Sequence, residues 1–140
     1  MPDLVTTAKR SEIMRAVKSA DTGPEIAVRK MLHRLGYRYR LHRRDLPGTP
    51  DIVFPGRRKV VFVHGCFWHG HLCRYGRLPR SKIEYWQPKI EANRKRDVRK
   101  LRELRRAGWE ALVVWQCELK HETRVVQKLV SFLGPSGRRV

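Results

Sequence analysis

An almost wholly apolar segment at residues 59–64 constrains the fold of this chain more than any other feature. Its sequence, KVVFVH, does not alternate between polar and apolar positions, which is typical of a strand that is covered on both faces. The turn-forming sequence PGRR at residues 55–58 precedes it, and residues 51–54 form another expected strand on the far side of that turn. The segment therefore predicts the buried central strand of a sheet, paired in a hairpin.

Helices and further strands are expected on both sides of this hairpin. Residues 24–35 repeat apolar positions with the i, i+3, i+4, i+7 spacing of an amphipathic helix, between a start signal at Thr22 and a stop at Gly36. The other expected elements are a helix at residues 11–19, a strand at 37–41, a long basic helix ending at Gly108, a strand at 109–115 and a helix at 121–133. Pro88 is expected either to lie near the start of the basic helix or to break its first turns. This order predicts an α/β fold with a mixed central sheet flanked by helices.

The length of 140 residues is enough for one hydrophobic core but too short for two folded units and a linker. Residues 1–140 are therefore expected to form a single, monomeric domain, with residues 134–140 as a loose basic tail. No apolar run reaches the roughly 18 residues that a membrane-spanning helix needs, and residues 1–10 lack the apolar region of a signal peptide. We expect a soluble, cytoplasmic protein with no membrane partner.

The charge balance indicates a polyanionic partner. The chain has 32 Lys and Arg against 13 Asp and Glu, a formal net charge of +19, and a surface this positive attracts polyanions from a distance. Nucleic acid is therefore the leading candidate partner. The basic run at residues 94–106 has two interpretations, because it can contact phosphates or can simply be the solvated face of an amphipathic helix.

One carboxylate and two histidines suit phosphodiester cleavage. If the hairpin turn is centred at residues 56–57, Asp51 pairs with Phe62 and shares a face with His64, at a diagonal distance of about 7 Å. A phosphate and a metal ion fit in such a gap, and cleavage needs a cation, a base and positive charge at the phosphate. Asp51 is the candidate Mg²⁺ ligand, His69 the candidate base and His64 the candidate phosphate contact. The alternative is that Asp51 only caps a turn and the histidines only bind metal.

Three cysteines, an odd number in a chain without an export signal, argue against a disulfide framework. Cys66-x₄-His71-x-Cys73 is a compact cluster, and Cys117 follows the last expected strand, so one Cys₃His zinc site uses every cysteine. The spacing leaves three histidines open for the histidine position: His64, His69 and His71. The alternative is three buried free thiols.

The same loop contains an aromatic pair, Phe67 and Trp68, that no helix or strand periodicity assigns to a core. Apolar side chains on a rigid loop beside a nuclease centre suit insertion between base pairs, which a mismatch makes easier. The alternative is that both side chains pack in the core.

Several motifs together resemble the very short patch repair (Vsr) endonucleases. The motifs are Met14 with Arg15-Ala16, Leu46-Pro47-Gly48-x-Pro50-Asp51, His64-Gly65-Cys66-Phe67-Trp68-His69, Cys73, Gly108-Trp109 and Val114-Trp115-x-Cys117. The resemblance covers about residues 7–117, and it implies a restriction-endonuclease-like fold. It also implies an enzyme that nicks double-stranded DNA 5′ to the thymine of a T:G mismatch, the product of 5-methylcytosine deamination, and so begins short-patch repair.

The resemblance implies a role for each candidate residue. Asp51 and the backbone carbonyl of Val63 would hold Mg²⁺, His69 would be the general base, His64 a phosphate contact, and Glu25 a support for the water network. The zinc ligands would be Cys66, His71, Cys73 and Cys117. The wedge that enters the DNA would be Met14, Phe67 and Trp68.

The sequence departs from the family pattern at two positions. Val63 stands where the family commonly has Thr, so a hydroxyl is lost at the metal centre, and Gly70 interrupts a run that is often richer in histidine. Two other functions stay open. One is a restriction-type or damage-specific nuclease on the same fold, and the other is a non-catalytic, zinc-stapled nucleic-acid-binding module, which would have no need of Asp51 or the loop histidines.

Overall fold

The computed structural model describes residues 22–71, 73 and 82–136. The expected helix at residues 11–19, the wedge candidate Met14 and the last residues, 137–140, lie outside this part of the chain.

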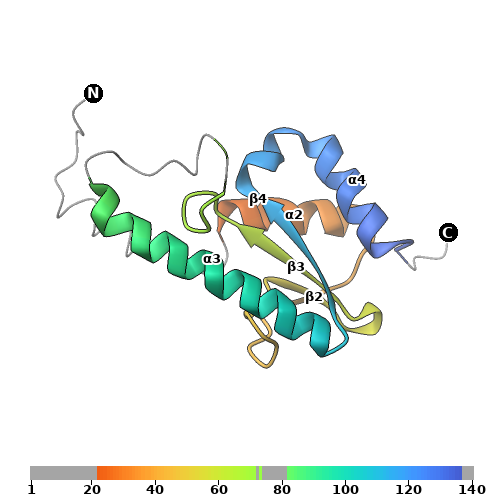
Figure 1. Ribbon diagram of the computed structural model, residues 1–140. Helices are drawn as coiled ribbons and strands as arrows, with labels where there is room; N and C mark the ends of the chain where they lie inside the picture. The colour runs from red at the N-terminus through yellow and green to blue at the C-terminus, as the bar shows by residue number, and fades with distance from the viewer. Residues whose placement is uncertain (1–21, 72, 74–81, 137–140) are drawn as a thin grey trace.

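A four-stranded mixed sheet forms the centre of the described structure (Figure 1). The strands are β1 (Arg40–Leu41), β2 (Ile52–Phe54), β3 (Lys59–His64) and β4 (Glu110–Trp115), and they lie in the order β1-β2-β3-β4. The two pairs formed by β1, β2 and β3 are antiparallel, whereas β3 and β4 are parallel. The mixed sheet predicted from the sequence is confirmed.

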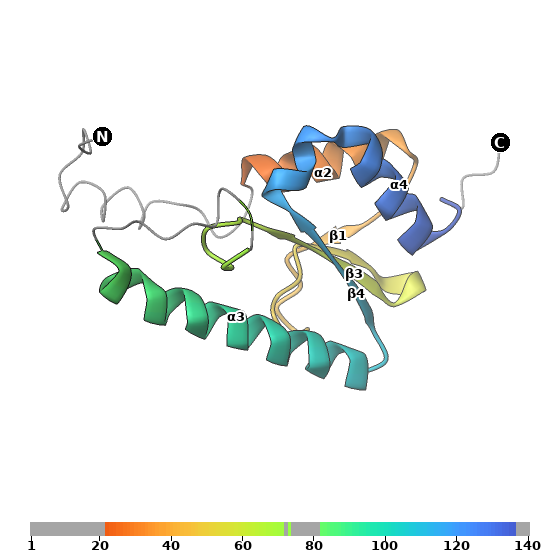
Figure 2. The same cartoon turned by 45° about the horizontal axis from the view of Figure 1, so that its top comes forward.

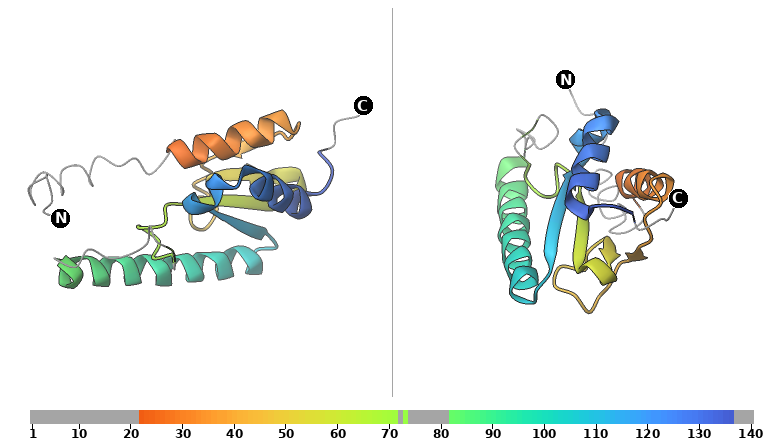
Figure 3. Two further views of the ribbon diagram at one scale, coloured as in Figure 1. Left: turned by 90° about the horizontal axis from the view of Figure 1, so that it is seen from above. Right: turned by 90° about the vertical axis from the view of Figure 1, so that its right-hand side faces the viewer.

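Helices cover both faces of this sheet (Figures 2 and 3). Helices α2 (Gly23–Arg34) and α4 (Glu122–Leu133) lie on one face, and the long helix α3 (Ile83–Arg106) lies on the other. Two short 3₁₀ helices, η1 (Pro55–Arg57) and η4 (Gln116–Lys120), complete the described elements. In the described part of the chain, no helix is both long and apolar enough to cross a membrane.

The apolar sequence of β3 is explained by a separate core on each face. Val61 packs with the residues of α2 and α4, whereas Val60 and Phe62 pack with Leu104 of α3. Successive side chains of a strand point to opposite faces, so a strand between two helical layers needs apolar residues at every position. β3 is therefore the fixed element from which the site is built.

The register of the β2–β3 hairpin agrees with the prediction. Val53 pairs with Val60 and Phe54 with Lys59, and the turn between them is closed by Arg58 in the left-handed region at φ 53°. Continued by one step past Ile52, this register sets Asp51 opposite Phe62. The residue just before β2 is therefore brought beside the end of β3.

Helix ends follow the local signals, with one difference at α3. The Thr22 hydroxyl accepts a hydrogen bond from the Glu25 amide at 3.3 Å and caps α2. Helix α3 begins at Ile83 and continues through Pro88. Pro88 is the sixth residue of α3, past the first amides that have no helical partner, so it removes one backbone hydrogen bond of the helix without ending it.

The carbonyl end of α4 is held by side chains of the hairpin. Lys59 Nζ donates to the Phe132 carbonyl at 2.6 Å, and Arg57 Nε donates to the Leu133 carbonyl at 3.2 Å. The Tyr37 hydroxyl donates to the Gly134 carbonyl just beyond the helix. Positive charge at a helix C-terminus stabilises the exposed carbonyls, so α4 is fixed to the sheet.

Candidate functional site

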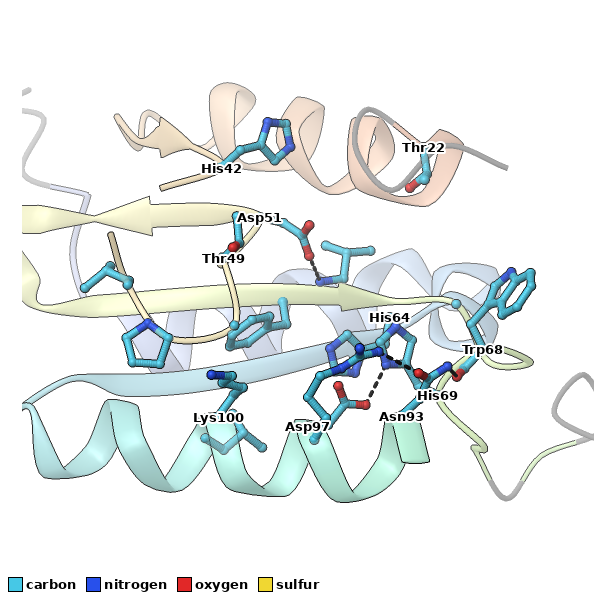
Figure 4. A pocket seen from close by; sticks show the side chains of 18 of the residues that line it. Thr22, His42, Thr49, Asp51, His64, Trp68, His69, Asn93, Asp97 and Lys100 are labelled. Atoms are coloured by element: carbon cyan, nitrogen blue, oxygen red, sulfur yellow. Dashed lines mark hydrogen bonds and ion pairs between the residues drawn. The ribbon is translucent and has the colours of Figure 1, made fainter. Parts of the chain in front are cut away.

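A groove of about 1360 Å³ opens at the end of the sheet where β2 starts and β3 ends. Its walls come from the start of α2, the segment between β1 and β2, the loop after β3 and one face of α3. Figure 4 shows Asp51 and His42 on the side of α2, and His69, Asn93 and Asp97 on the side of α3. Segments far apart in the sequence therefore contribute polar side chains to one space.

The Asp51 carboxylate is fixed by the backbone of β3. Its Oδ2 accepts a hydrogen bond from the Val63 amide at 2.7 Å. β3 extends past the paired part of β2, so this amide meets the Asp51 side chain instead of a strand carbonyl. The Thr hydroxyl that the family commonly has at position 63 is therefore not needed to orient Asp51, because a backbone group does so.

Two further side chains complete an oxygen-rich cluster around Asp51. Glu25, on α2, is only 1% exposed, and His42 Nε2 lies 2.9 Å from Glu25 Oε2. One ligand atom from each of Glu25, His42 and Asp51 lies within 4.8 Å of the other two. Burial raises the pKa of the Asp51 carboxyl to about 7, and the neighbouring Glu25 carboxylate adds to the rise, whereas the Val63 amide opposes it. This cluster would be stabilised by a bound cation.

Two imidazoles lie on the α3 side of the groove. His64 ends β3 and His69 lies on the following loop; their rings are parallel within 2°, with centroids 3.7 Å apart. His69 Nδ1 lies 2.6 Å from Asp97 Oδ2 on α3. Burial lowers the pKa of His64 to about 4, and the neighbouring His69 ring adds to the decrease, so His64 is neutral at neutral pH. Among the described residues, the buried His64 Nδ1 has no hydrogen-bond partner.

Sequence reasoning did not find Asp97 or His42. The available signal for Asp97 was one acidic residue in the basic run RKRDVRK, and spacing along a helix does not show that it meets a loop almost thirty residues away. The signal for His42 was weaker, because a single histidine after a short strand has many possible roles.

The four predicted zinc ligands meet in one cluster. Ligand atoms of Cys66, His71, Cys73 and Cys117 all lie within 4.8 Å of one another. Cys117 Sγ is 3.5 Å from His71 Nδ1, and the Cys117 amide donates to Cys66 Sγ at 3.3 Å. Of the three histidines that the spacing left open, the structure brings His71 to the cysteines. Three sulfur atoms and one imidazole are the donor set of a tetrahedral structural zinc site.

Trp115, the last residue of β4, lies between this cluster and the imidazole pair. Its ring stacks on His71 with centroids 4.1 Å apart, and it contacts His64 edge-on at 5.2 Å. The arrangement of the Cys₃His cluster therefore sets the position of a ring that also packs against the groove.

Phe67 and Trp68 are half-buried and line the groove. Both rings contact Trp86 edge-on, at centroid distances of 5.3 and 5.8 Å, and Trp86 itself is buried. The Trp68 carbonyl accepts a hydrogen bond from Asn93 Nδ2 at 2.9 Å. The aromatic pair is thus neither core nor free surface, but is held on α3 at the edge of the groove.

Gly70 lets the loop approach α3 closely. Its φ is +61°, and a Cβ at this position would lie 2.5 Å from Arg94 Cδ and 2.7 Å from Ile90 Cγ2. Neither the backbone conformation nor the space admits a side chain. This departure from the His-rich family pattern therefore has a physical reason in this chain.

The basic helix contributes only part of its charge to the groove. Arg96 and Lys100 of α3 line it, with Arg44 on the opposite wall. Arg94 instead packs against the loop at Gly70. Part of the basic run therefore lines the groove, and part lies on another face of α3.

A carboxylate cluster and an imidazole pair face each other across this groove, at the end of a mixed sheet that helices cover on both faces, and this arrangement suits a nuclease of the α/β class. The chain belongs to the Vsr family, since the family model described as "DNA mismatch endonuclease Vsr" matches residues 2–75.

Relatives match over nearly the whole chain. The type II nicking enzyme V.XorIIP of Xanthomonas oryzae pv. oryzae is 57% identical over 136 residues, 97% of this chain and 100% of that protein. The DNA mismatch endonuclease Vsr of Escherichia coli is 37% identical over 94% of this chain and 84% of its own length. Among solved structures, the catalytic domain of the homing endonuclease I-Bth0305I aligns with a TM-score of 0.56 and 21% identity, covering 80% of this chain and 94% of that domain. This last likeness supports the fold alone.

Proposed function

We propose that this protein nicks duplex DNA 5′ to the thymine of a T:G mismatch and so initiates very short patch repair of deaminated 5-methylcytosine. The observation that carries the proposal is the groove that joins Asp51, the stacked pair His64 and His69, and the aromatic edge formed by Phe67 and Trp68. The names of the relatives agree with it, because one is a mismatch endonuclease and others are nicking enzymes.

Asp51 fits a catalytic Mg²⁺ site. Oxygen donors are the ligands that Mg²⁺ prefers, and the buried Glu25 carboxylate and the half-buried Asp51 carboxylate provide them close together. The chemistry that Mg²⁺ supplies, when held by Asp51 and the Val63 carbonyl, is charge compensation at the scissile phosphate. Glu25 would hold water molecules beside that site.

The two imidazoles have different roles: His69 activates the water and His64 contacts the phosphate. Asp97 accepts the Nδ1 hydrogen of His69, so His69 Nε2 has its lone pair available to take the proton of the attacking water. Asp97 also stabilises the imidazolium that forms. His64 stays neutral and directs a hydrogen bond to a phosphate oxygen, and its lowered pKa avoids two stacked positive rings.

A zinc ion fits the Cys₃His cluster in a structural role. Burial raises the pKa of the Cys66 thiol to about 12 and raises that of Cys117 as well, so the thiolates depend on a cation for stability. With zinc bound, the loop that carries Phe67, Trp68 and His69 is fixed to the end of β4.

Groove cations and aromatics would then select the substrate. Arg44, Arg96 and Lys100 contact backbone phosphates and position the duplex without reading its sequence. Phe67 and Trp68 insert into the base stack, which costs a few kcal/mol per step and less beside a mispair.

A set of nicking assays tests the proposal. One strand of a T:G duplex should be cut when Mg²⁺ is present and stay intact when no divalent ion is present, and a fully paired duplex of the same sequence should be cut much more slowly. Asp51→Ala should abolish nicking and leave most of the DNA affinity, because phosphate contacts supply most of the binding free energy.

Other outcomes identify the alternatives. Equal cutting of the paired duplex would indicate a restriction-type nuclease. Tight binding with no cutting under any divalent ion would indicate a binding module. Substantial nicking by Asp51→Ala would show that the centre has been misplaced.

A further inference from the structure

We propose that His42 is a third protein ligand of the metal centre at Glu25 and Asp51, which makes this centre selective for transition ions of the Mn²⁺ class over Mg²⁺. The inference rests on the proposed function only in placing the metal centre at Asp51. It goes further in naming a nitrogen donor and the metal preference that follows from it.

The geometry places the imidazole within reach of both carboxylates. His42 Nε2 lies 2.9 Å from Glu25 Oε2, and donor atoms of the three residues lie within 4.8 Å of one another. Ligands that share one ion at bond lengths near 2.1 Å are separated by roughly 3 to 4 Å. Small rotations of these side chains are therefore enough to bring all three onto one ion.

The backbone holds His42 beside Asp51. The His42 amide donates to the Asp51 carbonyl at 3.1 Å, just past the end of the β1–β2 pairing. Its φ is +48°, in the left-handed region that non-glycine residues adopt uncommonly. This conformation belongs to an anchored residue with a half-buried side chain, and Figure 4 shows His42 on the same side of the groove as Asp51.

The charges around the cluster favour a bound divalent cation. Arg29 donates to Glu25 Oε2 at 2.8 Å and compensates the Glu25 charge. The Asp51 carboxylate receives the Val63 amide, which is not an ionic partner. A divalent cation would therefore stabilise the two neighbouring carboxylates, and the imidazole beside them offers a ring nitrogen as a third donor.

The donor set decides which ion is preferred. Carboxylates and carbonyls suit Mg²⁺, whereas imidazole nitrogen adds affinity for first-row transition ions and little for Mg²⁺. A centre with two carboxylates and one imidazole therefore binds Mn²⁺ more tightly than Mg²⁺, and this preference depends on His42.

The test uses Mn²⁺ as the probe and the full chain, loaded with zinc so that the cysteine cluster is filled. Free Mn²⁺ is followed by electron paramagnetic resonance during titration, and Mg²⁺ affinity is obtained by competition. The variants are His42→Asn, which tolerates the left-handed backbone, His42→Gln, which keeps the side-chain length, and Asp51→Asn. His33→Gln removes an exposed histidine of α2 and is the matched control.

Both His42 variants should weaken Mn²⁺ binding by about tenfold or more and Mg²⁺ binding by no more than about twofold. Electron spin echo modulation from a coordinated ¹⁴N nucleus should be present in the wild type and His33→Gln, and absent in both His42 variants. Circular dichroism checks that each variant is folded. If one of the two His42 variants does not fold, the other still tests the proposal.

Two failures are distinguishable. If Asp51→Asn loses Mn²⁺ while folded His42 variants keep both the affinity and the ¹⁴N signal, the role of His42 is refuted and the centre stands. If Asp51→Asn binds Mn²⁺ as the wild type does, the centre itself is misplaced, and the proposed function fails with it.

Discussion

The Nδ1 atom of His69 lies 2.6 Å from Oδ2 of Asp97, and this contact joins the loop after β3 to the middle of α3. It fixes the ring orientation and the position of the ring hydrogen, because a carboxylate accepts only from a protonated nitrogen. The Nε2 lone pair is then available to the groove. Under the proposed function, Asp97 would act on the reaction through His69.

Asp97→Asn should lower kcat by about 100-fold, since an Asn side chain can hold the ring in the wrong tautomer and cannot stabilise the imidazolium. Affinity for the T:G duplex should stay the same or rise slightly, because a negative charge leaves the groove. Single-turnover nicking and binding titrations measure the two effects. Glu103→Gln, the same charge change at another groove residue of α3, is the control. A kcat equal to that of the control would contradict the role of Asp97.

The fold was predictable where it depends on local patterns. The turn residues and the apolar run of β3 were enough to give the hairpin register, and this register brings Asp51 to His64. The partners of those residues were not predictable, because Asp97 and His42 meet the site through tertiary packing. Nothing in the spacing of α3 shows which of its faces meets the loop.

The close contact of Gly70 with α3 could not be predicted from the sequence either, and it supports a second prediction. Gly70→Ala should destabilise the protein by about 2 to 4 kcal/mol, from the left-handed backbone and the overlap with Ile90 and Arg94. Urea unfolding measures the loss. At Gly56 an added Cβ meets nothing within 4 Å, so Gly56→Ala is the control. Combining Gly70→Ala with Ile90→Ala should recover less than the full loss, because the backbone strain stays.

Equal stability of the two glycine variants would show that the loop moves away from α3 at no cost. In that case nicking of the T:G duplex should fall in Gly70→Ala alone, since the loop also carries His69.

The third prediction concerns the zinc content of the protein and its effect on folding. Purified protein should contain about one tightly bound zinc per chain, and Cys117→Ser should lose both the metal and the folded state. The reason is that the cluster joins the loop to the end of β4, where Trp115 stacks on His71. Metal analysis and circular dichroism follow the two losses. A wild-type protein that is stably folded without metal would contradict the prediction of a structural zinc site.

The end of α4 gives a prediction on stability alone. Lys59→Met should lower the free energy of unfolding by about 1.5 to 3 kcal/mol, because the Phe132 carbonyl loses a charged donor at 2.6 Å. Nicking should be unchanged in the folded variant, since Lys59 is at the other end of β3 from His64. Lys95→Met, an exposed lysine of α3, is the control for stability. A denaturation midpoint equal to that of the control would show that the contact contributes nothing.

The last prediction concerns the aromatic edge of the groove, formed by Phe67 and Trp68, and the preference for a T:G duplex over a paired duplex. Trp68 is held by Asn93 and Trp86 and lines the groove, and under the proposed function it would enter the base stack from this position. Separating base pairs costs a few kcal/mol per step, and the cost is lower beside a mispair. Trp68→Ala should therefore weaken binding to the T:G duplex much more than binding to the paired duplex.

Lys100→Gln provides the contrast, because a phosphate contact is the same on both duplexes. It should weaken both alike and reduce the slope of affinity against salt by about one ion. The measurement is a pair of binding titrations for each variant at fixed salt, repeated at several salt concentrations. Equal losses on both duplexes in Trp68→Ala would mean that the aromatic pair only supports the fold, and mismatch selection would then have to come from another part of the groove.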